Sequence, residues 1–407
     1  MIIPVFNVEH YIKESLNSII KQSIGFENLE VIMVNDCSTD KSGEIIDQFA
    51  SKYKNFNAIH LPENSGTPGK PRNIGIKFAT SKYLMFLDPD DYYTVDACEI
   101  LYHKIIEEKA DIISGKYDIL KSDQIIEINF KNKGFENSDT VKVKNIDECE
   151  NLLKLPPSVW TKIFKREFIQ KNEIMFPEEI PGEDLVFFIK SMLIARKIVF
   201  LNDYVVYHYR IRDKNNKSLS FNYTKNLIIG LMEAYMCVLE LLSKHGKEKY
   251  FPGTIKDHLG YWIEKISLSN LSYEDKMEAL ERSEKLFENC KKVNEVPNLK
   301  STIPIFNYII NKQFGEAILS MEKLRLVSDI NQIKKQYNSE LQKQKQQYEN
   351  KLQKQKQQYE NKLQKQKQQY ENKLQKQKQL IQEIKTSNSW KITKPLRKAS
   401  HYIKPKN

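Results

Sequence analysis

Two aspartates stand two positions apart, directly after an apolar run that has the pattern of a buried strand. The run is Tyr83–Leu87, and the sequence continues Asp88-Pro89-Asp90-Asp91. Carboxylates beyond the end of a strand suit a hard divalent cation, which takes oxygen ligands and shares them with phosphates. Asp-Pro-Asp-Asp is also good turn chemistry. By itself, this segment supports a metal site and a plain turn about equally.

Further polar side chains follow two other predicted strands. Asp36 comes after the apolar run 31–34 and could accept hydrogen bonds from a base or a ribose, although an aspartate there more often caps the next helix. Asn64 precedes a loop rich in Gly and Pro, whose backbone can approach a phosphate. Arg72 or Lys70 would then pair with that phosphate. A loop of this composition is weak evidence when taken alone.

Two more candidates for chemistry lie further along the chain. Glu183 and Asp184 precede an apolar helical pattern, where one of them could act as a general base. Acidic residues in a first helical turn also simply stabilise the helix. His208 lies between two tyrosines. It is either a metal or phosphate ligand or, as is more common, a packed and hydrogen-bonded ring.

These residues need a scaffold, and residues 2–117 alternate short apolar runs with helical patterns. Such alternation predicts a mostly parallel sheet covered by helices, with ligands bound beyond the carboxyl ends of the strands. The predicted strands are 2–5, 29–34, 57–61, 83–87 and 111–114, and the predicted helices are 8–22, 38–52, 71–79 and 95–108. Further along we predict helices over 159–171 and 183–195 and strands over 198–201 and 205–210. Because the chain starts one residue before its first strand, we expect that strand to be truncated and short of ladder hydrogen bonds.

Four short motifs occur in order between residues 1 and 212. They are Pro4-Val5-Phe6-Asn7, Val34-Asn35-Asp36-Cys37-Ser38-Thr39-Asp40, Arg72-Asn73-Ile74-Gly75 and Leu87-Asp88-Pro89-Asp90-Asp91. In order and spacing they resemble the family-2 glycosyltransferases of GT-A fold, which read P-x-Y-N, V-N-D-x-S-x-D, R-N-x-G and L-D-x-D-D. Phe6 replaces the usual Tyr, which keeps a ring to stack on a base and loses the hydroxyl. The loop N-S-G-T-P-G-K-x-R-N-x-G further resembles that of bacterial wall-polymer transferases.

The resemblance implies a role for each of these positions. It implies a nucleotide pocket lined by Pro4, Phe6, Asp36, Asn64 and Arg72. It implies that Asp90 contacts Mn²⁺ or Mg²⁺, with Asp88 toward the ribose or behind the metal ligand. Glu183-Asp184 matches the family's Glu-Asp pair, whose aspartate is the expected base. We keep His208 as a second candidate metal ligand.

The C-terminal third follows a different plan. Between 342 and 374 the sequence Gln-Lys-Gln-Lys-Gln-Gln-Tyr-Glu-Asn-Lys-Leu repeats three times without change. A period of 11 residues, about 3.67 per turn, predicts a straight or slightly right-handed supercoil. Such a thin stripe of Tyr and Leu gains little alone, so a homo-oligomeric coiled coil, dimer or trimer, is favoured over a solitary charged helix or a disordered tract.

The net charge of +11 is unevenly distributed. Residues 319–385 carry about +9, and 386–407 hold six Lys or Arg and no acid, so the basic character gives no argument for nucleic-acid binding by the catalytic region. The terminal segment resembles an S-W-x-x-T-x-P-L-R element that follows coiled coils in surface-polysaccharide enzymes. Its Trp390 and basic residues suit peripheral contact with an anionic membrane, and a disordered basic tail is the alternative. Five scattered cysteines and no visible signal segment favour a cytoplasmic protein, at the inner face of the membrane if the tail binds there.

Together these observations predict an α/β protein of GT-A fold with four regions. They are a catalytic domain over 1–215, a helical domain over 216–318, a coiled coil over 319–385 and a basic tail over 386–407. The predicted function is a metal-dependent inverting glycosyltransferase that moves a sugar from a nucleotide donor, UDP being the first choice, to a glycan or polyol-phosphate acceptor. The alternatives are a coiled-coil assembly protein with a degenerate transferase domain, and a nucleotidyltransferase. A donor-hydrolysis assay separates the first two.

Overall fold

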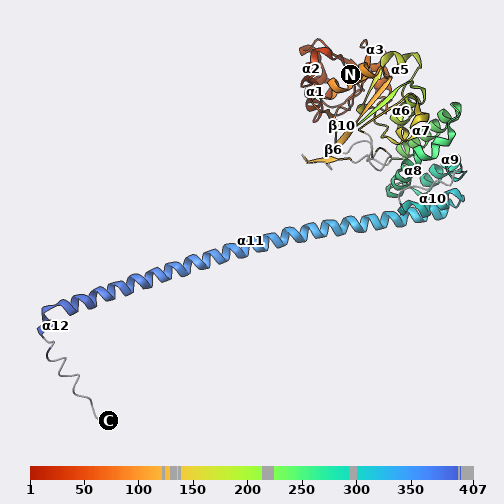
Figure 1. The fold of residues 1–407 in the computed structure, drawn as a ribbon. Helices are drawn as coiled ribbons and strands as arrows, with labels where there is room; N and C mark the ends of the chain where they lie inside the picture. Colours follow the sequence, from red (N-terminus) through yellow and green to blue (C-terminus); the bar gives the residue numbers. More distant parts are fainter. Residues whose placement is uncertain are drawn as a thin grey trace. The chain divides into compact units, whose positions relative to one another are not determined.

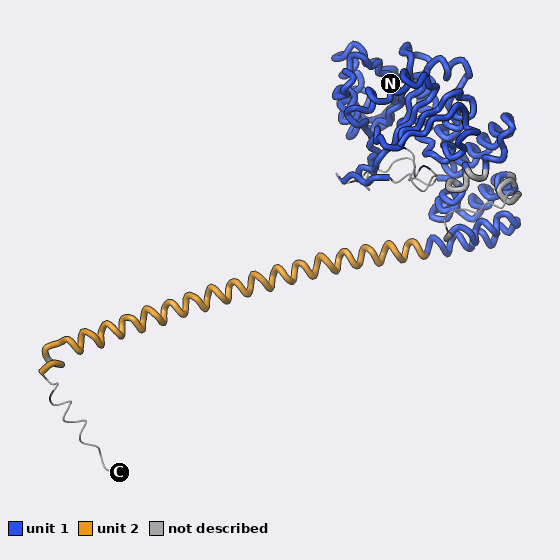
Figure 2. The backbone as a smooth tube through the Cα atoms, in the orientation of Figure 1, with its two compact units in different colours: residues 1–326 blue, residues 327–407 orange. Residues whose placement is uncertain are grey.

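The computed structural model describes residues 1–121, 124–128, 135, 139–212, 224–292, 300–392 and 395. The chain divides into two compact units, residues 1–326 and residues 327–407 (Figure 2). The first unit holds the described strands and most of the helices. The second consists of the greater part of one long helix and of the residues after that helix.

Three parallel strands form the first sheet, in the order β1-β2-β3 (Figure 1). Every residue of β1 and β2 is buried, as expected for strands covered by helices on both faces. All four residues of β1 pair with β2. Helix α3 lies so close to β1 that a Cβ on Gly75 would meet Ile2 Cγ2 at 2.3 Å. The elements are β1 (Ile2–Val5), α1 (Ile12–Ile20), η1 (Phe26–Asn28), β2 (Val31–Asn35), α2 (Ser42–Lys52), β3 (Phe56–His60) and α3 (Gly69–Phe78).

A seven-stranded sheet continues from the first through a parallel bridge between Ile2 and Phe86. Its order is β4-β9-β6-β10-β5, with β7 paired to β6 and β8 paired to β10. Strands β6 and β10 are parallel, and the other described pairs are antiparallel. The elements are β4 (Tyr83–Met85), β5 (Tyr92–Tyr93), α4 (Ala97–Glu108), β6 (Ile112–Lys121), β7 (Gln124–Glu127), β8 (Thr140–Val143), η3 (Ile146–Glu148), η4 (Glu150–Lys154), η5 (Val159–Thr161), β9 (Lys162–Lys165), α5 (Arg166–Lys171), α6 (Glu183–Ile194) and β10 (Ile198–Arg210).

The predicted α/β class with a parallel sheet is confirmed, and one predicted element is wrong. Residues 159–171 do not form a single helix: strand β9 occupies their middle, a short 3-10 helix precedes it, and only the last six residues are α-helical. Because β9 is inserted between β4 and β6, strand pairing overrides the helical pattern of that segment. The two strands predicted over 198–210 are one strand, β10, whose pairing with β6 shifts register after Phe200.

Helices complete the first unit around a buried tryptophan. Trp262 is fully buried, and its Nε1 donates to Ile228 O at 2.9 Å. By length and composition alone, α7 is the one described helix that could cross a membrane. Its buried side chains pack against α6, α8 and α9. The elements are α7 (Lys225–Lys244), η7 (Glu248–Tyr250), α8 (Phe251–Leu268), α9 (Tyr273–Lys292), η8 (Lys300–Thr302) and α10 (Ile303–Ile310).

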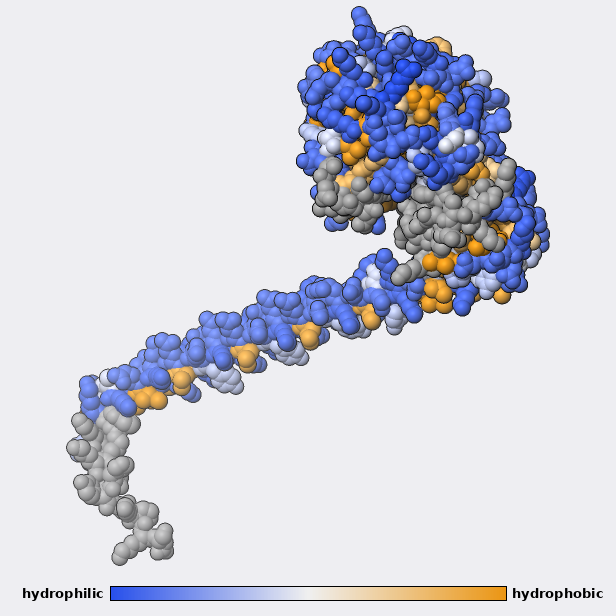
Figure 3. Space-filling model, turned by 45° about the vertical axis from the view of Figure 1, so that its right-hand side comes forward, coloured by the Kyte–Doolittle hydropathy of each residue, from blue (hydrophilic) through white to orange (hydrophobic). Residues whose placement is uncertain are grey.

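The long helix α11 (Phe314–Thr386) begins inside the first unit and forms the body of the second. In its first turns Ala317, Ile318 and Met321 are buried. Further along, its apolar side chains are exposed and recur at regular intervals along one side (Figure 3). Helix α12 (Asn388–Ile392) comes next. Residues 393, 394 and 396–407, which make up most of the predicted membrane-binding tail, lie outside the described residues.

Candidate functional site

Four of the predicted site residues lie just beyond the carboxyl ends of neighbouring strands. Phe6 follows β1, Asp36 follows β2, and Asn64 lies in the loop after β3. Asp88 follows β4, whose chain runs on beside β1 through Phe86. Because these strands run in the same direction, their ends meet at one edge of the sheet. The ring of Phe6 is 37% exposed there, whereas Pro4 is buried within β1.

Asp36 organises the loop after β3. Its carboxylate accepts hydrogen bonds from Asn64 Nδ2 at 3.1 Å, from Ser65 N at 2.9 Å and from Ser65 Oγ at 2.9 Å. Asp36 is only 4% exposed, whereas Asn64 lies at the surface. The two predicted pocket residues are therefore brought together, and the buried aspartate holds the exposed loop in one conformation.

Arg72 is the buried centre of an ionic network. From α3 its Nη1 donates to Glu183 Oε1 at 2.6 Å and its Nη2 donates to Asp88 Oδ1 at 2.8 Å, beside the ring of Phe176. Burial alone would lower the pKa of Arg72, but the two carboxylates raise it above its ordinary value. Since the guanidinium is only 5% exposed, it is engaged by protein carboxylates rather than presented to solvent.

The acidic turn after β4 is held by a tyrosine from β10. Tyr207 Oη donates to Asp91 Oδ2 at 3.1 Å and accepts from Asp88 N at 3.1 Å, and Arg210 N donates to Asp91 Oδ1 at 2.7 Å. Burial, together with the charges of the neighbouring carboxylates, raises the pKa of Asp91 well above its ordinary value. Burial likewise raises the pKa of Asp88, an effect that Arg72 opposes and Asp90 reinforces. The turn thus gathers three carboxyl groups, and Asp91 is the one that fixes the turn to β10.

Two arginines from the end of β10 reach this turn. Arg212 Nε donates to Asp90 Oδ2 at 2.6 Å, and Arg210 Nη2 lies 2.6 Å from Glu14 Oε2. Both guanidinium groups stand over the ring of Tyr11, at 5.3 and 5.6 Å from its centroid. Sequence reasoning did not single out Tyr11, Arg210 or Arg212, because nothing in the sequence indicates that β10 ends beside the acidic turn.

His208 is oriented by a buried aspartate that sequence reasoning missed. The two residues stand opposite each other on the parallel strands β10 and β6. His208 Nδ1 is 2.6 Å from Asp118 Oδ1, and the imidazole also contacts the ring of Tyr92 at 4.9 Å between centroids. In the tautomer in which Nδ1 donates its proton to the aspartate, the Nε2 lone pair is available. The only signal in the sequence was an acid within an apolar run, and that does not reveal its partner.

Glu183 and Asp184 begin helix α6 in different surroundings. Glu183 is 6% exposed and bound to Arg72, and burial raises its pKa to about 7 despite that partner. Asp184 is partly exposed, and among the described residues its carboxylate accepts only from the backbone N of Leu185, at 2.8 Å. Of the two, Asp184 is the carboxylate available to a substrate.

The acidic turn has the donor chemistry for a divalent cation but not a complete ligand set. Within the described residues, no three His, Cys, Asp or Glu side chains converge on one point. Asp90 has its Oδ1 oxygen left after pairing with Arg212, and His208 has its Nε2. Carboxylate oxygen and imidazole nitrogen both suit Mn²⁺, and the mutual repulsion of Asp88, Asp90 and Asp91 favours a cation. The donor types of these two side chains therefore suit such an ion, which would complete its shell with substrate oxygens and water.

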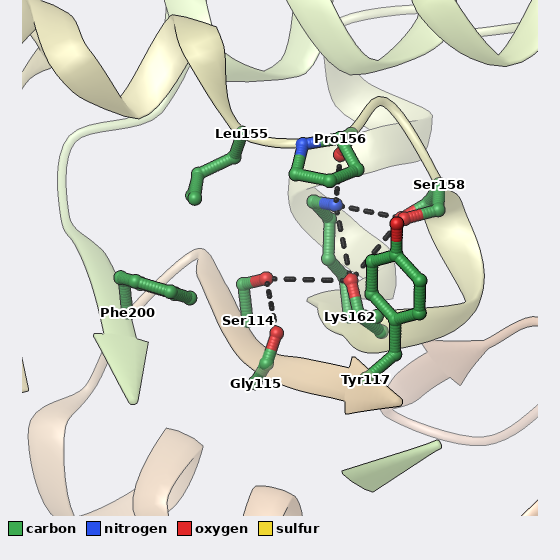
Figure 4. A pocket seen from close by; sticks show the side chains of 9 residues that line it. Ser114, Gly115, Tyr117, Leu155, Pro156, Ser158, Lys162 and Phe200 are labelled. Atoms are coloured by element: carbon green, nitrogen blue, oxygen red, sulfur yellow. Dashed lines mark hydrogen bonds between the residues drawn. The ribbon is translucent and has the colours of Figure 1, made fainter. Parts of the chain in front are cut away.

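A lysine buried behind Asp184 was also missed. Lys162 at the start of β9 is 1% exposed, and its Nζ donates to Ser158 O at 2.6 Å and to Pro156 O at 3.1 Å (Figure 4). It also stands 4.7 Å from the ring centroid of Phe188, one turn along α6 from Asp184. Burial lowers the pKa of Lys162 from 10.5 to about 7, an effect that Asp184 partly offsets. A buried cation thus lies behind the candidate base.

Replacing Lys162 with methionine should change how stability depends on pH. The unfolded chain holds this proton up to about pH 10.5 and the folded protein releases it near pH 7. Between these values the unfolded state binds more protons, so wild-type stability gains from rising pH. Relative to Lys162→Met, the wild-type free energy of unfolding should rise by on the order of 4 kcal/mol between pH 7 and pH 10. Urea titrations of both proteins measure this, and parallel stability curves would refute it.

Polar side chains gather at one edge of the sheet, beyond the ends of parallel strands. An acidic turn and a carboxylate at the start of a helix lie beside them. This combination is typical of GT-A type transferases of activated sugars. Comparison with known proteins supports this class. Residues 1–138 match the profile described as glycosyl transferase family 2. The chain is also 30% identical over 217 residues to the glycosyltransferase GlyG of Streptococcus pneumoniae, across 52% of this chain and 70% of that protein. The chain belongs to glycosyl transferase family 2.

Two further proteins resemble this chain, one in sequence and one in structure. A poly(ribitol-phosphate) beta-glucosyltransferase of Bacillus spizizenii is 35% identical over 234 residues, across 57% of this chain. The chain spans only 35% of that relative's length. The crystal structure of residues 1–349 of Staphylococcus aureus TarS in complex with UDP-GlcNAc superimposes with a TM-score of 0.64 at 25% identity, and the match covers 80% of this chain and 90% of that one. The chain is thus related in sequence to a transferase named for poly(ribitol phosphate) and in fold to TarS.

Proposed function

We propose that this glycosyltransferase moves a sugar from a UDP-sugar to a hydroxyl group of a polyol-phosphate polymer, with inversion at the anomeric carbon. The observation that carries the proposal is the contrast between two adjacent acids: Glu183 is locked to buried Arg72, and Asp184 beside it is accessible. The relatives supply the substrate classes, because one bears UDP-GlcNAc and another is named for poly(ribitol phosphate).

The donor nucleotide would bind at the sheet edge after β1, β2 and β3. Phe6 offers a ring to stack on the base, and the Asp36–Asn64 loop offers polar atoms to the base and ribose. Asp88, held by Arg72, would face the ribose or stand behind a metal ligand. Arg72 would act by fixing Asp88 and Glu183, since its guanidinium is already paired with both.

The transfer step needs one base and one leaving group. Asp184 would take the proton of the acceptor hydroxyl while that oxygen forms its bond to C1 of the donor sugar. The bond between C1 and the phosphate oxygen breaks at the same time, and UDP leaves with the electron pair. A single displacement of this kind inverts the anomeric centre.

Asp90 and His208 are the residues that would hold Mn²⁺ or Mg²⁺ at this site. When bound, the ion supplies positive charge for the diphosphate as it leaves. Asp90 would offer Oδ1, because Oδ2 accepts from Arg212, and His208 would offer Nε2. Asp118 would not contact the ion itself; it would act by fixing the tautomer of His208.

Removing Asp118 should weaken metal binding, although Asp118 itself would not be a metal ligand. Asp118→Ala leaves Nδ1 of His208 without its acceptor, and loss of such an outer partner typically costs 10–100-fold in metal affinity, so a weakening of roughly that size is expected. Asp118→Asn keeps an oxygen acceptor and should recover part of it. Calorimetry with UDP and Mn²⁺ measures the affinity, and ¹⁵N NMR of the metal-free protein reports the tautomer. The matched control is Asp47→Ala, which removes the carboxylate beside His60, 3.0 Å away on α2. Unchanged affinity and tautomer in Asp118→Ala would exclude the role.

The proposal is tested by measuring UDP release from a panel of UDP-sugars, with and without a poly(ribitol phosphate) acceptor. We expect release that depends on acceptor, and a product whose glycosidic proton shows inverted configuration by NMR. No release with any nucleotide sugar would favour the assembly protein with a degenerate domain. Consumption of a sugar phosphate and UTP without UDP release would favour a nucleotidyltransferase.

A further inference from the structure

The repeated part of α11 presents a stripe of apolar side chains that is exposed among the described residues of its own unit. The three tyrosines of the repeats, Tyr348, Tyr359 and Tyr370, are 74–76% exposed, and Leu352, Leu363 and Leu374 are 52–55% exposed. They alternate at spacings of four and seven residues, so with 11 residues in three turns they fall on one face. Figure 3 shows this row of apolar side chains along one side of the helix.

The two edges of the stripe differ in charge, because only one of them carries acidic side chains. In every repeat a Glu follows the Tyr by one residue, as in Glu349, and a Lys precedes the Leu by one residue, as in Lys351. One step along an α-helix turns by about 100°, so a step forward from Tyr and a step back from Leu lead to opposite edges of the stripe. The edge that carries Glu also carries one Lys per repeat, three residues before the Tyr, as in Lys345, whereas the opposite edge carries Lys and no acid. These two edges, called here the Glu edge and the Lys edge, run the length of the repeats on either side of the apolar face.

This arrangement discriminates between the two ways in which two copies can pack. If the two helices are parallel, a two-fold axis along them places the Glu edge of one copy against the Lys edge of the other. In register, Glu349 then meets Lys351 of a second copy at nearly the same level, and the other repeats do likewise. If the helices are antiparallel, each edge faces the same edge of the other copy: the Glu edge, with its Glu and Lys, meets itself, and along the other side Lys meets Lys with no acid to offset the repulsion. Opposite charges flanking an apolar seam set orientation in coiled coils.

The repeat alone would allow the two copies to slip by 11 residues, but its flanks do not. On the N-terminal side the stripe continues through Leu326, Ile330 and Tyr337, and on the C-terminal side it ends at Ile381. A slip by one repeat would leave one Tyr and one Leu uncovered at an end of the seam. It would also pair unlike flanking residues. Full overlap buries the most apolar surface.

We propose that residues 326–381 bind a second copy of this chain as a parallel, in-register coiled coil. The surface is independent of the transfer chemistry and goes beyond it. Chain connectivity then brings the segments that precede α11 in each copy to the same end of the seam. Two transferase units tethered to one another could hold one polymer chain at two places, which raises effective concentration.

The proposal is tested in the full-length protein with Tyr348→Cys and Tyr370→Cys, made separately. Both positions are exposed on α11, so the fold of residues 1–326 is unaffected. Under mild oxidation each variant should form a disulfide-linked pair with itself, and wild type, with its five native cysteines, should not. After trypsin digestion the linked peptides identify the joined positions. Light scattering of the unmodified protein gives the number of copies, and a dimer or a trimer agrees with the proposal.

Three results would overturn the proposal. Linkage only in a mixture of Tyr348→Cys with Tyr370→Cys would show an antiparallel pair. Linkage in a mixture of Tyr348→Cys with Tyr359→Cys, but in neither alone, would show either a slipped parallel register or an antiparallel pair with residues 326–381 fully overlapped. A monomeric mass at micromolar concentration would show that the stripe does not bind a second copy. None of these outcomes depends on whether the protein transfers sugar, so a failure here is distinguishable from a failure of the proposed activity.

Discussion

Asp184→Asn should reduce sugar transfer by about 10³-fold while leaving UDP binding within a few-fold of wild type. Asparagine fills the same volume and can still accept from Leu185 N at the start of α6. It cannot take a proton from the acceptor hydroxyl, so the step that fails is the chemical one. Turnover measured by UDP release and donor affinity measured by calorimetry separate these two effects.

The matched control for this substitution is Glu44→Gln. Glu44 is an exposed acid in the first turn of α2, as Asp184 is in the first turn of α6. Both changes remove one negative charge from a helix start, where it stabilises the helix by a few tenths to about 1 kcal/mol. Glu44→Gln should therefore keep its turnover. Turnover near wild type in Asp184→Asn would remove Asp184 from the role of base, and equal losses in both variants would point to stability instead.

The sequence predicts the ends of the parallel strands well because their signal is local. An apolar run followed by Asp36 or by Asp88 marks where a strand stops, and parallel strands place such stops at one edge. The start of α6 at Glu183 is also correctly predicted, because acids before an apolar helical pattern are a local signal as well.

The features that the sequence could not predict depend on contacts between distant segments. Asp118 meets His208 across 90 positions, and only the register of β6 against β10 brings them together. Strand β9 is predicted as part of a helix because its place between β4 and β6 has no local signal. Arg72 illustrates a third limit: its position is predicted, but its engagement by two protein carboxylates depends on how α3 and α6 pack.

Arg72→Met should lower the free energy of unfolding at pH 8 by about 3–5 kcal/mol, because removing the cation of an ion pair leaves the charge of its partner carboxylates uncompensated inside the protein. Glu183 would be left buried, and Asp88 partly buried, without their cation. Methionine preserves much of the volume beside Phe176, so lost packing is a smaller contribution. As a control, Arg282→Met removes an exposed arginine that pairs with Glu233 and Glu278, which should cost no more than about 1 kcal/mol.

The pH dependence and a second substitution identify the cause of the Arg72→Met defect. Without Arg72 the folded-state pKa of Glu183 rises above the value of about 7 that it already has, so the folded protein binds more protons than the unfolded chain from about pH 4.5 upward. The stability of the variant then falls as pH rises, and its deficit should be smaller at pH 5 than at pH 8. Arg72→Met with Glu183→Gln removes one of the two stranded charges and should recover part of the loss at pH 8. Urea titrations of the single and double variants at both pH values decide the point. The contrary result would be a deficit that is the same at both pH values, with no recovery in the double variant. Arg72 would then stabilise the fold through packing, and not by neutralising the charges of Glu183 and Asp88.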